Sequence, residues 1–220
     1  MSTFRLTAYL ATPIALGTTY FTLDAVLFGI LSDMRDLGIS NADPIENIPL
    51  ASINGMFLAS AAEFHAPVEA GEVKIGGIRT VRDMADAVAF IAPVRGSRIA
   101  KIDTTRSHFK AHMSRYRNIA ADTVSWLAEG NPLAAKRLVE QAGSIGALRK
   151  DGHGQIARVG VEEVSIASVL TTAQGGVTRP IPIALAPLLG IETSDLVTVE
   201  TWRPPYWLAA NRAECLVPTS

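Results

Sequence analysis

The chain begins with a stretch in which apolar and polar residues alternate. Over residues 3–11 the apolar positions are Phe4, Leu6, Ala8 and Leu10, and the polar ones between them are Arg5, Thr7 and Tyr9. A period of two is typical of a strand with one buried face. We therefore predict a half-buried strand here.

The next stretch, residues 22–38, changes to a helical period. Its apolar residues recur at three- and four-residue spacing and are Leu23, Val26, Leu27, Ile30, Leu31, Met34 and Leu37. Such a stripe predicts an amphipathic helix. Thr22 is placed to cap its beginning, and Gly38 to end it in a left-handed conformation.

A second helix is predicted over residues 131–143. Asn131 suits the N-cap, Pro132 the first helical position and Gly143 the residue just past the end. The apolar stripe of this helix consists of Leu133, Leu138, Val139 and Ala142.

The other predicted elements are strands. Residues 50–64 and 68–81 look like two strands or long hairpin arms. Residues 119–130 and 155–166 also have strand character, and a short helix is the alternative for residues 119–130. The order of elements predicts an α+β fold, a ferredoxin-like (RRM-like) βαββαβ domain with helices on one face of an antiparallel sheet. We expect this domain to span residues 1–164, with an insertion at about 92–122.

The last part of the chain differs in character. Residues 171–220 hold six prolines and no long helical pattern. We expect residues 165–220 to form a β-rich, partly extended segment that packs on the first domain.

Composition limits the class of protein. Hydrophobic residues make up 48% of the chain, which is enough for a core, but no apolar run is long enough to span a bilayer. The N-terminus lacks the basic and apolar regions of a signal peptide. The single cysteine, Cys215, cannot form an internal disulfide. We expect a cytoplasmic protein with no membrane partner, in which Cys215 acts as a small hydrophobic residue.

The net charge of −1 hides an uneven distribution. Residues 95–117 carry seven cations and one acid, a net charge of +6, whereas the remainder carries 13 cations and 20 acids. Cations neutralise phosphates, and aromatic rings stack on the bases of single-stranded RNA. The candidate RNA-binding residues here are Arg95, Arg98, Lys101, Arg106, His108, Phe109, Lys110, His112, Arg115, Tyr116 and Arg117. The alternative is that residues 95–117 form a charged, solvent-exposed segment with no partner.

Metal binding is not expected in this basic segment. His108 and His112 are four residues apart, a spacing that can bind zinc from one face of a helix. A zinc site needs a third protein ligand, and no Cys, Asp or Glu lies between or just beside these histidines. We expect neither a metal nor another cofactor.

A glycine-rich loop with cations occupies residues 143–156. Its candidate RNA-binding residues are Gly143, Gly146, Arg149, Lys150, Gly152, His153 and Gly154. Glycines let a ligand approach the backbone closely, and exposed amides bind phosphate oxygens. The spacing is neither the dinucleotide fingerprint nor a Walker A loop. The alternative is a long connection that needs several positive φ angles.

Near the C-terminus, residues 202–207 read WRPPYW. The diproline favours a stiff, extended backbone. Trp202, Arg203 and Tyr206 are candidates for docking RNA or an adjacent subunit. The alternative is an aromatic clasp that packs the C-terminal segment on the core.

Several of these stretches resemble one known family. The loop at residues 143–156 looks like the glycine-rich loop of the RAMP superfamily of CRISPR-associated proteins. TAYLATPIALG (7–17) and LDAVLFGIL (23–31) look like the opening strand and helix of that superfamily. RPIPIAL (179–185) and WRPPYW are similar to the Cas-five-like subunit of type IV CRISPR effector complexes.

The resemblance implies a non-catalytic subunit that grips the 5′ handle of the guide RNA (crRNA) and caps one end of a filament of backbone subunits. It also implies contacts with the large subunit of the complex and with target DNA near its flanking motif. A protrusion called the thumb reaches the RNA in this family, and residues 95–117 are the candidate.

Two other functions remain open. Relatives in the superfamily cleave precursor guide RNA, and His153, Tyr116 and Lys110 are candidate catalytic groups. No His-Tyr-Lys constellation can be placed from the sequence, so no catalytic residue is assigned. The other alternative is a ferredoxin-like domain with an unrelated partner. An ordinary RNA-recognition motif is disfavoured, because its aromatic-rich octapeptide is absent.

Overall fold

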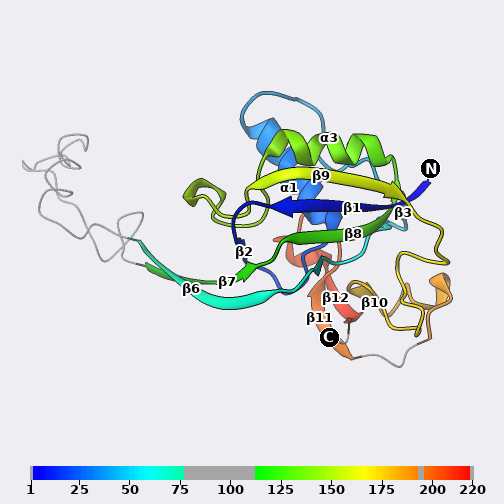
Figure 1. The fold of residues 1–220 in the computed structure, drawn as a ribbon. Coiled ribbons are helices and arrows are strands. Elements are labelled where there is room, and N and C mark those ends of the chain that lie inside the picture. The colour runs from blue at the N-terminus through cyan, green and yellow to red at the C-terminus, as the bar shows by residue number, and fades with distance from the viewer. Residues whose placement is uncertain (1, 77–111, 193–195, 219–220) are drawn as a thin grey trace, which may run out of the picture. The chain divides into compact units, whose positions relative to one another are not determined.

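The centre of the molecule is an antiparallel four-stranded sheet with the order β5-β8-β1-β9. Its strands are β1 (Ser2–Leu10), β5 (Glu63–Phe64), β8 (Thr123–Gly130) and β9 (Ile156–Glu163). The computed structural model describes residues 2–76, 112–192 and 196–218 (Figure 1). The mixture of helices with antiparallel strands confirms the α+β class.

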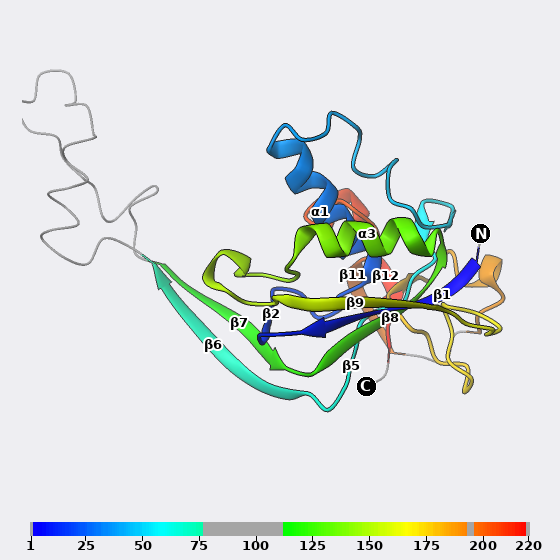
Figure 2. The same ribbon diagram turned by 45° about the horizontal axis from the view of Figure 1, so that its top comes forward.

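The alternation predicted for the first strand is confirmed. Phe4, Leu6 and Ala8 are fully buried and lie opposite Ala128, Trp126 and Val124 of β8. The helices α1 (Leu23–Asp36) and α3 (Pro132–Ala142) cover this apolar face (Figure 2). The opposite face of the sheet carries the polar residues of the same strands.

Helix α1 forms where predicted, with two differences. Leu23, Val26, Leu27 and Ile30 are buried, but Leu37 lies past the last turn and is 74% exposed. The Thr22 side chain makes no cap bond, because its hydroxyl pairs with the Tyr206 hydroxyl at 3.0 Å. Gly38 has the expected positive φ of 70°.

Helix α3 also forms where predicted. The Asn131 carboxamide oxygen accepts a bond from the Ala134 amide at 3.1 Å, and Gly143 ends the helix with a φ of 66°. Leu133 was expected in the apolar stripe but is 60% exposed. Ala135 is buried instead, together with Val139.

The prediction of one long strand over residues 50–64 is wrong. The segment forms three short strands, β3 (Ser52–Ile53), β4 (Met56–Phe57) and β5. Asn54 and Gly55 have φ angles of 51° and 79°, and two consecutive positive values make the tight turn that joins β3 to β4.

The chain divides into two compact units. The first consists of Met1–Glu69 and Asn118–Ser220, and the second of Ala70–Arg117, which overlaps the insertion expected at about 92–122. The strands β6 (Val68–Gly76) and β7 (His112–Ala120) cross the unit boundary. They belong to a three-stranded sheet of order β2-β7-β6, in which β2 is Ile14–Leu16.

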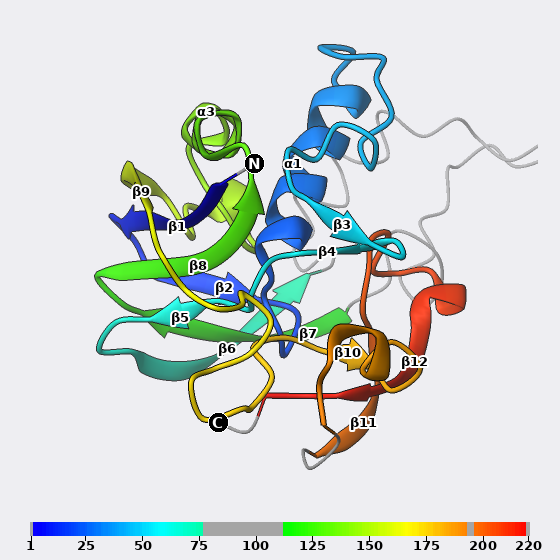
Figure 3. The same ribbon diagram turned by 90° about the vertical axis from the view of Figure 1, so that its right-hand side faces the viewer.

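The C-terminal segment adds short strands to the first unit. The strands β10 (Ile181–Pro182), β11 (Val197–Thr201) and β12 (Arg212–Leu216) form a sheet of order β10-β12-β11, at the lower right of Figure 3. The short 3-10 helices η2 (Arg149–Asp151), η3 (Pro187–Leu189) and η4 (Ala209–Asn211) lie in connections.

A second apolar cluster holds this segment in place. Its buried members are Met56, Leu58, Val169, Leu170, Val177, Ile181, Ala186, Ile191 and Leu216. Cys215 is fully buried beside it in β12, and burial raises the pKa of its thiol to about 11. The expectation that Cys215 acts as a small core residue is confirmed.

Candidate functional site

The glycine-rich loop between α3 and β9 is bound tightly to the rest of the first unit. The Ala147 amide donates to the Ala15 carbonyl at 2.7 Å, and the Gly154 amide donates to the Pro13 carbonyl at 2.8 Å. The Thr12 hydroxyl donates to the Gly152 carbonyl at 2.8 Å and accepts from the Gln155 amide at 3.0 Å. These bonds fix the loop backbone in one conformation.

Two different physical reasons explain why glycine occurs at the four positions of the loop. A Cβ atom on Gly146 would lie 2.7 Å from the Ala15 carbonyl oxygen, and one on Gly154 would meet the Ile145 carbonyl oxygen at 1.9 Å. Close approach of the protein's own backbone therefore accounts for these two glycines. Gly143 and Gly152 have positive φ angles of 66° and 91° with open space around them. Only their backbone conformation requires glycine.

The cations of the loop lie on η2. Arg149 makes an ion pair of 2.6 Å with Asp33 of α1, so its charge is already balanced. Lys150 is exposed, and His153 is half-buried in the turn that follows. The exposed Lys150 ammonium can pair with an outside anion.

A hollow of about 270 Å³ lies beside this loop. It is lined by α1, by residues 16–18 and by residues 144–147 of the loop, with Arg149 at its border. Gly29 lies in the middle of α1 and lines the hollow, and a Cβ atom there would meet nothing within 4 Å. Packing therefore does not explain this glycine, which costs helix stability.

Most residues of the candidate thumb lie outside the described residues. The ones outside are Arg95, Arg98, Lys101, Arg106, His108, Phe109 and Lys110. His112 begins β7. Arg115 and Arg117 are exposed on the same strand and, two residues apart, share one of its faces, while Tyr116 is half-buried.

The C-terminal motif is held by a buried polar network. Arg179 is fully buried, and its Nη1 donates to Asp24 Oδ1 at 3.0 Å and to the Phe57 carbonyl at 2.7 Å. Its Nη2 donates to the Trp202 carbonyl at 2.7 Å, and the Tyr206 hydroxyl donates to Asp24 Oδ2 at 2.5 Å. The network ties the C-terminal segment to the first turn of α1.

Electrostatics fixes the protonation of this network. Burial opposes the charge on Arg179, but the Asp24 carboxylate and the Tyr206 hydroxyl outweigh it and raise the pKa of the guanidinium. Burial, followed by the Asp24 charge, raises the pKa of Tyr206 far above its ordinary value. The phenol is therefore a neutral donor. Sequence reasoning missed Asp24 and Arg179, although an acid inside an otherwise apolar helical turn was a usable signal.

The residues of WRPPYW make contacts within the protein. Residues 203–207 form bends and a turn, with a cis peptide bond between Pro204 and Pro205, so the expected extended backbone is wrong. The Arg203 Nε donates to Asn211 Oδ1 at 2.9 Å, and its guanidinium lies 4.6 Å from the centre of the Trp202 ring. These internal contacts fit the aromatic clasp, the alternative given above for this motif.

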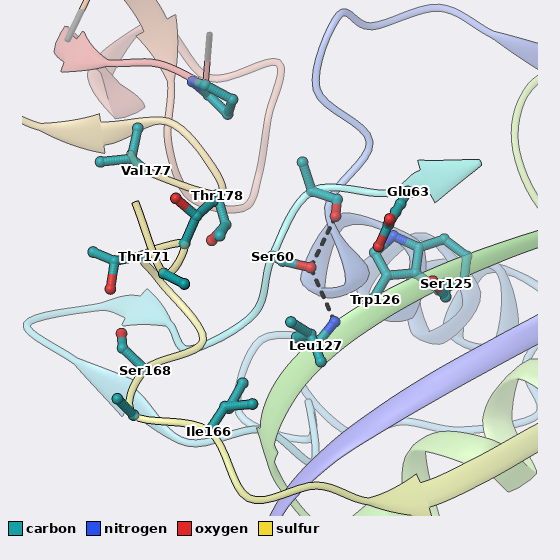
Figure 4. A pocket seen from close by; sticks show the side chains of 15 residues that line it. Ser60, Glu63, Ser125, Trp126, Leu127, Ile166, Ser168, Thr171, Val177 and Thr178 are labelled. Carbon is teal, nitrogen blue, oxygen red and sulfur yellow. Dashed lines mark hydrogen bonds between the residues drawn. The ribbon is translucent and has the colours of Figure 1, made fainter. Parts of the chain in front are cut away.

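A second hollow, of about 580 Å³, is lined by hydroxyl groups between the central sheet and residues 166–178 (Figure 4). The Ser60 hydroxyl donates to the Ala61 carbonyl at 2.8 Å and accepts from the Leu127 amide at 3.0 Å. The Thr178 hydroxyl donates to the Val169 carbonyl at 2.6 Å. Glu63 is the single acid among the lining residues, and no basic side chain lines the hollow with it. Ser60 and Thr178 thus serve the fold.

Within residues 2–76, 112–192 and 196–218, no group of three or more His, Cys, Asp or Glu side chains could hold a metal ion. No helix in these ranges is long and apolar enough to cross a membrane.

Comparison with known families found no family whose sequence profile matches this chain, and comparison with curated proteins found no match.

Proposed function

We propose that this chain is a non-catalytic guide-RNA-binding subunit of a type IV CRISPR effector complex. In this role it holds the 5′ handle of the crRNA and caps the filament of backbone subunits. Its further partners are the large subunit and target DNA near its flanking motif. The observation that carries the proposal is a helix–glycine loop–strand connection that is held by the Thr12 bonds and presents the exposed Lys150.

The topology supports a ferredoxin-like domain of the kind that the RAMP resemblance implies. In the spatial order β9-β1-β8-β5, β1 lies between β8, the strand before α3, and β9, the strand after α3. With β5 taken as the second strand, β8 as the third and β9 as the fourth, this order supports the split βαβ arrangement that we propose.

The mechanism is binding to a preformed surface. A phosphate beside η2 forms an ion pair with the Lys150 ammonium. Because the Thr12 bonds and the close packing of Gly154 already hold the loop, little conformational entropy is lost when RNA binds. The exposed Arg115 and Arg117 supply charge for further phosphates in the second unit.

The test uses purified full-length protein and the labelled CRISPR repeat RNA encoded in the same genome, without metal. We expect the RNA to be retained intact. Lys150→Ala should weaken binding and lower the salt dependence by roughly 0.7 in log–log slope, the value for one phosphate contact in single-stranded RNA. The matched control is Lys136→Ala, which removes a cation on α3 that pairs with Glu140 at 3.6 Å.

Two outcomes would overturn the proposal. If neither variant differs from the natural protein in affinity or salt slope, the loop does not hold RNA. If the repeat is cut at one phosphodiester and His153→Ala abolishes the cutting while binding persists, the chain is a processing endoribonuclease.

A further inference from the structure

The face of the central sheet that points away from the helices carries a stacked pair of side chains. Tyr9 of β1 lies opposite Arg158 of β9, and the Arg158 Cζ lies 3.5 Å from the centre of the Tyr9 ring. At this distance the guanidinium covers the face of the ring. Arg158 is exposed, and Tyr9 is half-buried.

Gly160 leaves the space beside the ring without a side chain. It is the next residue of β9 on the same face and pairs with Thr7. A Cβ atom on Gly160 would meet Tyr9 Cε2 at 3.7 Å, an ordinary contact distance, so the edge of the ring is within reach of this position but has no side chain against it. The stack therefore consists of one ring that carries a planar cation.

The surroundings of the stack are polar. The other strand positions around it on this face are Thr7, Thr123 and Ser125, so short hydroxyl side chains flank the stack. The arginine of β1, Arg5, lies on the same face and is paired with Glu162 at 3.5 Å. The charge of Arg158 is placed on an aromatic ring. A planar cation surrounded by hydroxyls suits a planar, anionic ligand. It suits an apolar protein surface less well.

The stack adjoins the glycine-rich loop. Arg158 is near the beginning of β9, which directly follows that loop. Thr12, just past the end of β1, bonds to the Gly152 carbonyl and the Gln155 amide. An RNA strand whose phosphate is held at Lys150 can therefore continue onto this end of the sheet face.

We infer that Tyr9 and Arg158 form a platform on which a base of single-stranded RNA stacks. Bases stack on aromatic rings and on guanidinium planes, and such contacts depend little on sequence. This inference rests on the proposed function and adds a second contact to it. The loop binds phosphates, and the platform binds the face of a base.

The test compares two oligonucleotides of equal length, a single-stranded RNA and the same ribose-phosphate backbone without bases. Fluorescence anisotropy measures both dissociation constants. The quantity compared is the dissociation constant of the backbone without bases divided by that of the RNA. The natural protein should prefer the RNA with bases. Arg158→Lys keeps the charge but removes the plane, and we expect it to lower the ratio roughly five- to 150-fold, the range for one stacked base. Tyr9→Ala should lower the ratio similarly.

The control is Arg5→Lys, which lies on the same face but in an ion pair, and it should leave the ratio unchanged. Circular dichroism checks that each variant folds, and Arg158→Lys remains informative if Tyr9→Ala does not. An unaltered ratio in Arg158→Lys, with RNA still bound, overturns the platform and spares the proposed function. If the natural protein binds neither oligonucleotide, the proposed function fails and the platform fails with it.

Discussion

Gly154 lies so close to the Ile145 carbonyl that a Cβ atom on residue 154 would come within 1.9 Å of that oxygen. Gly152, two residues away in the same loop, has nothing within 4 Å of such an atom. Both have positive φ angles, of 64° and 91°. The two glycines therefore share a backbone cost on substitution, but only Gly154 adds a steric one.

The first prediction follows from this difference. Gly154→Ala should lower the free energy of unfolding by about 2–4 kcal/mol, because it combines overpacking with left-handed strain. Gly152→Ala should cost about 1–2 kcal/mol, the price of the left-handed conformation alone. Urea titration of both variants measures the difference, and equal costs would contradict the packing assigned to the loop.

The second prediction concerns the buried network. Arg179→Met should cost about 3–5 kcal/mol, because it leaves the Asp24 carboxylate buried without its cation. The double variant Asp24→Leu/Arg179→Met should recover part of that loss, since no buried charge remains. Unfolding of the natural protein, both single variants and the double variant completes the cycle. Strictly additive effects would mean that the two residues do not act as a pair.

The third prediction uses the unexplained glycine of α1. Gly29→Ala should raise the free energy of unfolding by up to about 1 kcal/mol, because alanine is the better helix former and meets no neighbour at this position. Gly38→Ala is the matched control. It also meets no neighbour but has a φ of 70°, so it should destabilise. Thermal unfolding compares the two, and a loss of stability in Gly29→Ala would show that the space beside α1 is not free.

The fourth prediction concerns alkaline pH. The thiol of Cys215 has an ordinary pKa of 9.0, and burial raises it to about 11 in the folded chain. Between these values the unfolded chain loses a proton that the folded chain keeps, so the stability that this group contributes is complete below pH 9 and falls as pH rises toward 11. Cys215→Ala should show a shallower fall over this window in urea titrations at successive pH values. Identical slopes would mean that the thiol does not titrate differently on unfolding.

The features that local sequence determines were predictable. Asn131, Pro132 and Gly143 bound α3 because capping depends on neighbours in the chain, and the alternation from Phe4 to Ala8 reflects one buried face. The Asn54-Gly55 dipeptide carried an equally local signal for a tight turn.

The features that depend on distant residues were not predictable. Arg179 and Asp24 are 155 positions apart, and no periodicity connects them. The glycines of the loop were visible, but the sequence could not say whether a ligand or the protein's own backbone approaches them. For Gly146 and Gly154 it is the protein's own backbone. The partner of Arg149, Asp33 of α1, is equally hidden from local patterns.

The most direct test of the central claim is to sequence the RNA that copurifies with the tagged chain from the cell that encodes it. The account predicts guide RNAs that begin with a repeat-derived 5′ handle, and less RNA with Lys150→Ala than with the control Lys136→Ala. RNA with no enrichment of repeat sequence over a tag-only purification would contradict the assignment of this chain as the handle-binding subunit.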